Sequence, residues 1–288
     1  MRFLRWPMLT GLVIGMVSIA FGGESLTAKK QKAAVKGESK LPDTSDASKT
    51  LDLSQLSLNL VYEADFSKPL KFIAENDLFA NGKRVRKPEG VDWVLEGKGS
   101  AAVEQGRLHL KNDSSHVVFW NTREFPADFL LEFGMSPVDS NIGLAIVFFA
   151  AIGLKGESIF DPDQPRRDGD FQTYHSGAIN CYHTSYWATT EQGEPRGTAH
   201  IRKNAGFHLV AMGKDFIAGQ GPGPHRVRVL KVGGKIQVEA DGKIEVQWED
   251  DGATFGPALK EGLIGLRQMA YTKECSYTHF KVWGVKSK

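Results

Sequence analysis

Side chains that can move protons or bind anions gather in two neighbouring segments of this chain. Residues 172–186 contain histidine, tyrosine and asparagine, and residues 198–204 add histidine, arginine and asparagine. Histidine titrates near neutral pH and can act as a base or an acid, whereas arginine pairs with carboxylates. These residue types together favour proton transfer on a substrate that carries a negative group.

The first reaction that such a set could perform is β-elimination at a uronate. It needs a cation or an amide to neutralise the carboxylate, a base for the C5 proton and an acid for the leaving oxygen. The predicted catalytic residues are His200 or His175 as the base, Tyr182 as the acid, and Arg202 or Arg267 with Asn180 at the carboxylate. The predicted substrate-binding residues are Asn180, Tyr186, Asn204, Arg267, Gln268 and Trp120.

Glycoside hydrolysis by two carboxylates is the second reaction to consider. No predicted strand carries the closely spaced acids that a retaining enzyme of this kind needs. Several aspartates instead occupy the loop Asp161–Asp170, where one could be a catalytic acid or the group could hold a structural Ca²⁺, which prefers oxygen ligands. A solvated loop without a ligand is the ordinary alternative, and we expect no other cofactor and no catalytic metal.

A carbohydrate-binding protein without turnover is the alternative from another functional class. Trp120, Tyr186 and Trp187 could stack on the apolar faces of sugar rings. The same aromatic residues could equally well pack in the core. A histidine and an arginine at one place favour an enzyme over a simple binding surface, because they suggest proton transfer beside an anion.

Two predicted strands must position these side chains. In the segment Ser176–Trp187, alternation places Asn180, Tyr182 and Tyr186 on one face, which we expect to meet the ligand, and His183 on the other, which we expect in the core. In the segment 198–204, His200, Arg202 and Asn204 share a face. A register slip of one residue would reverse every assignment.

The rest of the folded chain also predicts short strands separated by turns. Residues 225–232, 235–240 and 243–248 alternate polar and apolar side chains, and Asp241-Gly242 is a strong hairpin signal between the last two. No convincing helix is evident. We therefore expect an all-β fold, a two-sheet antiparallel jelly-roll sandwich over residues 56–288. Further strands are expected at 107–110, 116–120, 129–135, 142–150, 262–269 and 276–283.

The N-terminal residues resemble an export signal. Arg2 and Arg5 precede an apolar run at 7–21, and small residues follow, so we expect a signal peptide over 1–23 and a secreted or periplasmic protein. A membrane anchor is the alternative, but the run is shorter than the ~20 apolar residues of a membrane span. Residues 24–55 are mostly small, polar or charged, which favours a disordered spacer.

Composition excludes some partners and leaves the cysteines open. The net charge is +2 and the basic residues are scattered, so neither nucleic acid nor, after signal cleavage, a membrane is an expected partner. A polysaccharide or oligosaccharide is the expected one. Cys181 and Cys275 could form a disulfide in an exported chain or remain buried thiols.

The motifs at 172–186 and 198–211 resemble those of a bacterial family, the domain of unknown function numbered 1961. The C-terminal order of an alternating hairpin, a Gly-Leu-Ile-Gly-Leu-Arg strand and an aromatic strand is similar to concanavalin A-like domains that process glycans. The resemblance covers Leu58 to Val285. Some relatives are encoded among genes for breaking down pectin-type polysaccharides, which implies a carbohydrate context but no particular reaction.

Overall fold

The computed structural model describes residues 50–85, 87–138 and 142–288. The predicted signal peptide and residues 24–49 of the predicted spacer lie outside this range. In the described part of the chain, no helix is long and apolar enough to cross a membrane. Leu51 and Leu53, at the end of the predicted spacer, contact apolar residues of the folded domain.

Strands dominate the described residues, as the alternating pattern predicts. The short helix α2 (Phe171–His175) departs from the expectation that no helix forms. Residues 107–110 and 116–120 belong to one continuous strand, because β5 pairs with both ends of it across the predicted turn. The strands are β1 (Leu56–Glu63), β2 (Phe72–Ala74), β3 (Phe79–Ala80), β4 (Lys83–Arg84), β5 (Trp93–Glu104), β6 (Arg107–Asn121), β7 (Phe129–Pro137), β8 (Leu144–Gly153), β9 (Ile179–Ala188), β10 (Thr198–Asn204), β11 (His208–Lys214), β12 (His225–Val232), β13 (Lys235–Ala240), β14 (Lys243–Glu249), β15 (Leu263–Gln268) and β16 (Glu274–Ser287).

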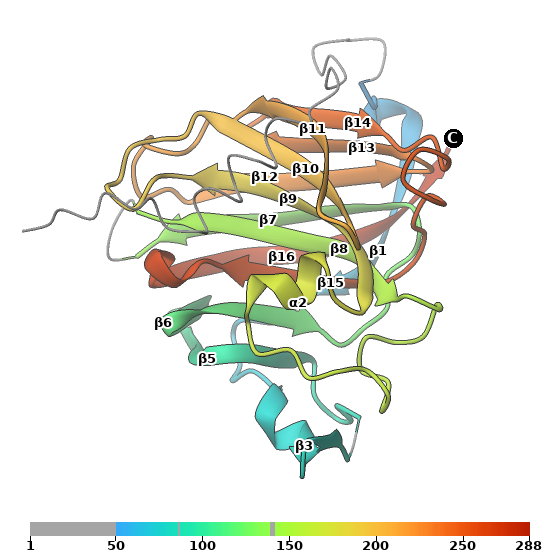
Figure 1. Cartoon of the computed structure of the whole chain (residues 1–288). Coiled ribbons are helices and arrows are strands. Elements are labelled where there is room, and N and C mark those ends of the chain that lie inside the picture. The colour runs from blue at the N-terminus through green and yellow to red at the C-terminus, as the bar shows by residue number, and fades with distance from the viewer. Residues whose placement is uncertain (1–49, 86, 139–141) are drawn as a thin grey trace, which may run out of the picture. The chain divides into compact units, whose positions relative to one another are not determined.

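The strands form an antiparallel sandwich of two layers (Figure 1). In the front sheet the order is β11-β10-β9-β8-β15-β6, with β5 and β2 beyond β6. In the back sheet the order is β16-β7-β12-β13-β14, with β1 on β16. The long strand β6 pairs with β15 through its last residues and with β16 through its first, so it joins the two layers. The jelly-roll prediction is confirmed.

The main hydrophobic core fills the space between the sheets. Residues from the strands of both layers point into it, among them Leu266 of β15, Ile201 of β10 and Leu131 of β7. We call the side of each sheet that faces this core its inner face, and the opposite side its outer face. Trp93 stacks on Phe119 in this core, with ring centroids 4.8 Å apart.

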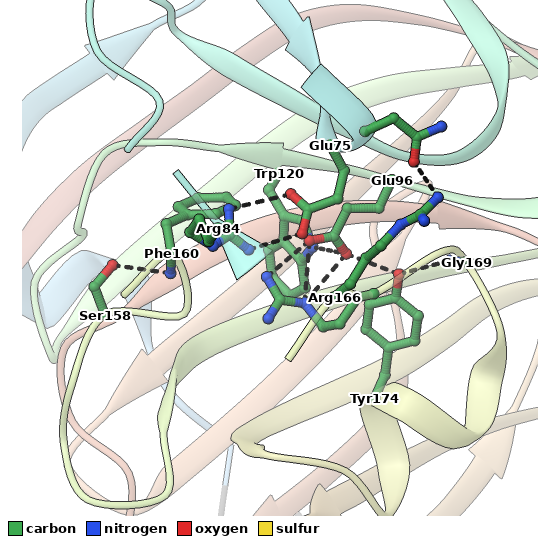
Figure 2. A network of polar contacts seen from close by, with 11 residues as sticks. Glu75, Arg84, Glu96, Trp120, Ser158, Phe160, Arg166, Gly169 and Tyr174 are labelled. Atoms are coloured by element: carbon green, nitrogen blue, oxygen red, sulfur yellow. Dashed lines mark hydrogen bonds and ion pairs between the residues drawn. The ribbon is translucent and has the colours of Figure 1, made fainter. Parts of the chain in front are cut away.

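A second, smaller core lies on the outer face of the front sheet, beneath the segment 154–178. Its centre is the carboxylate of Glu96 on β5, which is fully buried. Arg167 donates from Nη2 to Glu96 Oε1 at 2.8 Å, and the Trp120 indole and the Tyr174 hydroxyl donate to Oε2 at 2.8 and 2.7 Å. Figure 2 shows Glu96 with Trp120 and Tyr174 around it. These bonds attach the covering segment to the sheet.

Helix α2 takes its place from the same interactions. Asp170 caps its N-terminus by accepting a hydrogen bond from the backbone N–H of Gln172 at 2.8 Å. Tyr174, near its C-terminal end, reaches Glu96 and stacks on Phe148 of β8 at 5.5 Å. Alternation cannot reveal so short a helix. It carries Phe171 and His175 over the outer face of the sheet.

Cys181 and Cys275 are both buried free thiols, which answers the question that the sequence left open. Cys181 lies in the outer core and Cys275 in the main core. Burial raises the pKa of the Cys181 thiol to about 12, so it stays protonated at neutral pH.

Replacement of Arg167 by methionine should destabilise the protein by about 3–5 kcal/mol, because it leaves the buried Glu96 carboxylate without its cation. Urea unfolding followed by tryptophan fluorescence measures the free energy of unfolding. Arg166 is the matched control, since it is the adjacent arginine and is exposed. Arg166→Met should change stability by no more than about 0.5 kcal/mol. Similar unfolding midpoints for the two variants would contradict the central role of Glu96.

Candidate functional site

The pairing of β9 with β10 determines which side chains share a face. His200 lies opposite Ser185, and Arg202 lies opposite His183. Directly opposed residues of an antiparallel pair lie on the same side of the sheet. This side is the outer face, because Ala199 and Ile201 between these residues point into the main core. His200 and Arg202 are therefore together on the outer face, as predicted, but with His183 rather than Tyr182.

The predicted faces of the 176–187 segment are thus wrong. The strand begins at Ile179 rather than at Ser176, and Tyr182 and Tyr186 are fully buried in the main core. The Tyr182 hydroxyl donates to Asp250 Oδ2 at 2.5 Å, and Lys203 Nζ lies 2.7 Å from the same oxygen. Tyr182 therefore ties the sheets together and cannot be the acid of the predicted elimination.

Arg267 extends the outer-face row to a fourth strand. It lies opposite Ile146 of β8, which in turn lies opposite Ser185 of β9. Its side chain has no exposed surface, and no salt bridge to it occurs among the described residues. Its guanidinium packs on the Phe171 ring, 4.2 Å from the centroid, and Nη1 contacts Met269 Sδ at 3.1 Å. Nε and Nη2 have no hydrogen-bond partner within the described part of the chain.

Aromatic rings fill the space between the two arginines. Phe171 contacts Phe207, in the β10–β11 turn, with centroids 5.1 Å apart, and His175 lies 4.5 Å from Phe207. Arg202 lies over the Phe207 ring at 3.9 Å and donates from Nη1 to the Phe207 carbonyl at 3.0 Å. The Phe207 backbone has a φ of 57°, which is unusual for a residue with a side chain and occurs often at functional sites.

We call this cluster the His/Arg face. It draws on β6, α2, β9, β10, the β10–β11 turn and β15, and Phe171, Phe207, His175 and His200 are partly exposed. Its members are His116, Phe171, His175, His183, His200, Arg202, Phe207 and Arg267.

Burial and the two arginines keep the histidines of this face neutral. Burial is the main cause of a lowered pKa at each of them, and positive charge from the arginines adds to it. The pKa of His200 falls to about 4, first through burial and then through Arg202 and Arg196. Burial lowers the pKa of Arg267 to about 10, so the guanidinium remains a cation at neutral pH. The face therefore offers neutral imidazoles beside fixed positive charge.

Several predicted ligand-binding residues are not on this face. Gln268 is buried on the inner side, where its amide donates to the Tyr277 hydroxyl at 3.3 Å. Trp120 is on the outer side but fully buried beneath the covering segment. A side chain at Gly265 would collide with the Trp120 ring, 2.5 Å from an added Cβ, so glycine lets the indole lie against the sheet. Trp187 is buried in the main core. None of these side chains is an exposed stacking platform.

The two predicted asparagines, Asn180 and Asn204, contact residues next to the His/Arg face. Asn204 is buried, and its Nδ2 lies 2.8 Å from His183 Nδ1 and 3.3 Å from Cys181 Sγ. Asn180 is partly exposed, and its Oδ1 accepts from the Ala205 N–H at 3.4 Å. These contacts hold the end of β10 and the turn that carries Phe207.

The aspartates of the loop 161–170 serve as turn and cap acceptors. Asp161 Oδ1 accepts from the Asp163 N–H at 3.0 Å, and Asp168 Oδ1 accepts from the Asp170 N–H at 3.2 Å. Among residues 50–85, 87–138 and 142–288, no three His, Cys, Asp or Glu side chains come close enough together to hold a metal ion.

Sequence reasoning missed several contributors to the site. His116 is on the outer side of β6, and Phe171 and Phe207 come from a helix and a turn. Two-residue alternation describes strands only, so it gives no signal for the last two. His116 is the first residue of the predicted strand 116–120, and alternation back from Trp120 places it on the same face as that residue.

Comparisons with known proteins agree with this architecture. An uncharacterised protein of Bacillus subtilis (strain 168), YesU, is 39% identical over 193 residues, which span 65% of this chain and 87% of that protein. A crystal structure of a Bacillus subtilis protein of unknown function with a galectin-like fold is 36% identical, with a TM-score of 0.62. The matched region covers 68% of this chain and 91% of the chain in that crystal structure.

The carbohydrate-binding module CBM66 of Bacillus subtilis is more distant, at 13% identity and a TM-score of 0.42, over 73% of this chain and 98% of that one. A likeness of this degree carries no information about a ligand. Residues 78–282 match the family described as a domain of unknown function, DUF1961. This match confirms the resemblance seen in the two motifs, and the chain belongs to the DUF1961 family.

Proposed function

We propose that this protein is an extracytoplasmic enzyme that cleaves a uronate-containing polysaccharide or oligosaccharide by β-elimination on the His/Arg face. The observation that carries the proposal is Arg267, a buried cation with unpartnered Nε and Nη2 atoms. A desolvated charge without a partner is costly in free energy, and such costs are typically retained at functional sites. A planar carboxylate fits a guanidinium through two parallel hydrogen bonds.

The neighbours of Arg267 supply the chemistry of an elimination. Arg202 adds a second guanidinium on the same face, and together the two cations would stabilise the charge that spreads into the carboxylate when the C5 proton leaves. His200 is partly exposed and neutral, so it can take that proton. The aromatic rings of Phe171 and Phe207 offer apolar surface to a sugar ring.

Hydrolysis by two carboxylates fits this face less well. Such enzymes place two acids about 5–10 Å apart around the scissile bond. Glu96 is fully buried and paired with Arg167, and Asp170 caps helix α2. Carbohydrate binding without turnover is the second candidate function, because half-buried Phe171 and Phe207 beside two arginines would also suit a binding surface.

The purified protein should release both new reducing ends and unsaturated uronate, seen by ultraviolet absorbance, from a pectic, algal or host polysaccharide. Replacement of His200 by alanine should lower the rate at least about 100-fold, because the base is lost. Thermal unfolding of each variant checks that the fold is retained.

His208→Ala is the matched control for this experiment. His208 is in the same hairpin but pairs with the inner-face residue Lys203 and stacks on Phe255. It should keep the wild-type rate. Reducing ends without ultraviolet absorbance would show hydrolysis and contradict elimination, and saccharide binding without products would favour the binding function.

Replacement of Arg267 by methionine should abolish binding of uronate oligosaccharides and at the same time raise the free energy of unfolding, by about 1 kcal/mol or more. The reason is that methionine removes a buried charge that has no partner, whereas the volume stays similar. Isothermal titration calorimetry and urea unfolding measure the two effects. This result would be opposite in sign to the loss expected for Arg167→Met. A large fall in stability without loss of binding would mean that Arg267 has only a structural role.

His200 should remain a free base far below the usual pH range of histidine. Its pKa of about 4 means that it loses its proton as the pH rises through 4, not through the ordinary value of ~6.5. The unfolded chain takes up the proton first as the pH falls. The contribution of this residue to the free energy of unfolding therefore falls progressively from pH ~6.5 to pH ~4. NMR titration of the ring signal, assigned with His200→Gln, measures the pKa. Arg202→Met should raise it, and a midpoint near ~6.5 in the wild type would contradict the prediction.

A further inference from the structure

Tyr271 borders the His/Arg face and has no role in the mechanism so far. It lies in the 3₁₀ helix Ala270–Thr272, which follows β15. Its side chain is partly exposed. Burial raises its pKa, and the positive charges of Arg196 and Arg267 act in the opposite direction. The proposed elimination, meanwhile, lacks a donor for the leaving oxygen, because Tyr182 is buried in the core.

Arg196 holds the Tyr271 hydroxyl in place. It comes from the connection between β9 and β10, and its Nη2 donates to Tyr271 Oη at 3.1 Å. Its Nε donates to the Thr189 carbonyl at 2.8 Å, which anchors the guanidinium to the backbone at the end of β9. The arginine is thus fixed at one end and presents its other nitrogen to the phenol.

The Tyr271 hydroxyl is protonated and makes only a long hydrogen bond as a donor. Burial raises the pKa of Tyr271, so the hydroxyl keeps its proton at neutral pH. The Tyr271 hydroxyl oxygen lies 3.4 Å from the Thr189 carbonyl oxygen, well beyond the ~2.7–2.8 Å of an ordinary O–H···O bond. A substrate oxygen could therefore take the phenolic proton without breaking a strong hydrogen bond.

The acid and the base border the same cations. Arg196 also lowers the pKa of His200, and Arg267 acts on His175 and His183 as well as on Tyr271. The nearby positive charge of Arg196 and Arg267 would stabilise the phenolate that remains after proton transfer, against the opposing negative charge of Glu191.

We propose that Tyr271 is the catalytic acid of the uronate elimination and that Arg196 is its positioning residue. The inference rests on the proposed function. His200 takes the C5 proton, the electron pair forms the C4–C5 double bond, and the C4–O bond breaks. Tyr271 gives its proton to the departing oxygen. Water then reprotonates the phenolate and accepts the proton of the histidinium, so that no oxidant, reductant or further reactant is needed.

The test compares leaving groups that differ in their need for a proton. Tyr271→Phe should lower kcat on a natural uronate oligosaccharide at least about 100-fold, with KM nearly unchanged. On a synthetic uronate with a nitrophenyl ether at O4, the same variant should stay within a fewfold of the wild type, because a nitrophenolate leaves without protonation. Arg196→Gln should show the same difference between the two substrates, but smaller.

Tyr62→Phe is the control for loss of a phenol, since Tyr62 contacts core aromatics from β1. It should keep the wild-type rate on both substrates. An equal loss by Tyr271→Phe on both substrates, or no loss on either, would overturn the assignment of Tyr271 while leaving the elimination itself standing. Absence of elimination by the wild type on both substrates would overturn the proposed function and this inference together.

Discussion

The buried carboxylate of Glu96 is the interaction on which the outer side of the front sheet depends. It accepts hydrogen bonds from a strand residue, Trp120, and from two residues of the covering segment, Arg167 and Tyr174. Such a charge is stable in the interior only when it is paired and fully hydrogen-bonded. The segment must therefore close over Glu96, and in closing it carries helix α2 to its place. Phe171 then lies over Arg267, and His175 lies against Phe207.

The buried arginines of this outer side have contrasting surroundings. Arg167 and Arg84 each pair with a glutamate, whereas Arg267 faces aromatic carbon and sulfur. A paired buried arginine organises the fold, because its partner is part of the same chain. The unpaired one raises the free energy of the folded state, and under the proposed function a substrate carboxylate would offset that cost. Arg267 lies in a row with Ser185 and His200, so a carboxylate bound there would be on the same face as the proposed base.

Most of the fold could be predicted from alternation and turn residues, because exposed and buried positions of antiparallel strands differ so clearly. The strands 225–232 and 235–240 have the predicted bounds. The face of a strand is harder to predict than its existence. Tyr182 and His183 exchange places relative to expectation, because buried tyrosines with partners such as Asp250 look polar in a sequence. Only the register with β10 settles which of the two lies on the outer face.

The candidate site was predictable only in part, because the sequence placed the strand β10 and Arg267 on the right face but the residues of β9 on the wrong one. His200, Arg202 and Arg267 come together as expected, with His175 beside them. Residues on turns and short helices, such as Phe207 and Tyr271, take their positions from contacts distant in sequence. No local pattern records those contacts.

Odd-numbered and even-numbered residues of strand β10 lie on opposite faces of the sheet. Ala199, Ile201 and Lys203 point inward, where Lys203 joins Asp250, and His200 and Arg202 point outward. Substitutions on the outward side leave the inward contacts intact. The outward residues can therefore change without a rebuilding of the sandwich, so relatives that share the fold and the inward residues can differ in the chemistry of this face.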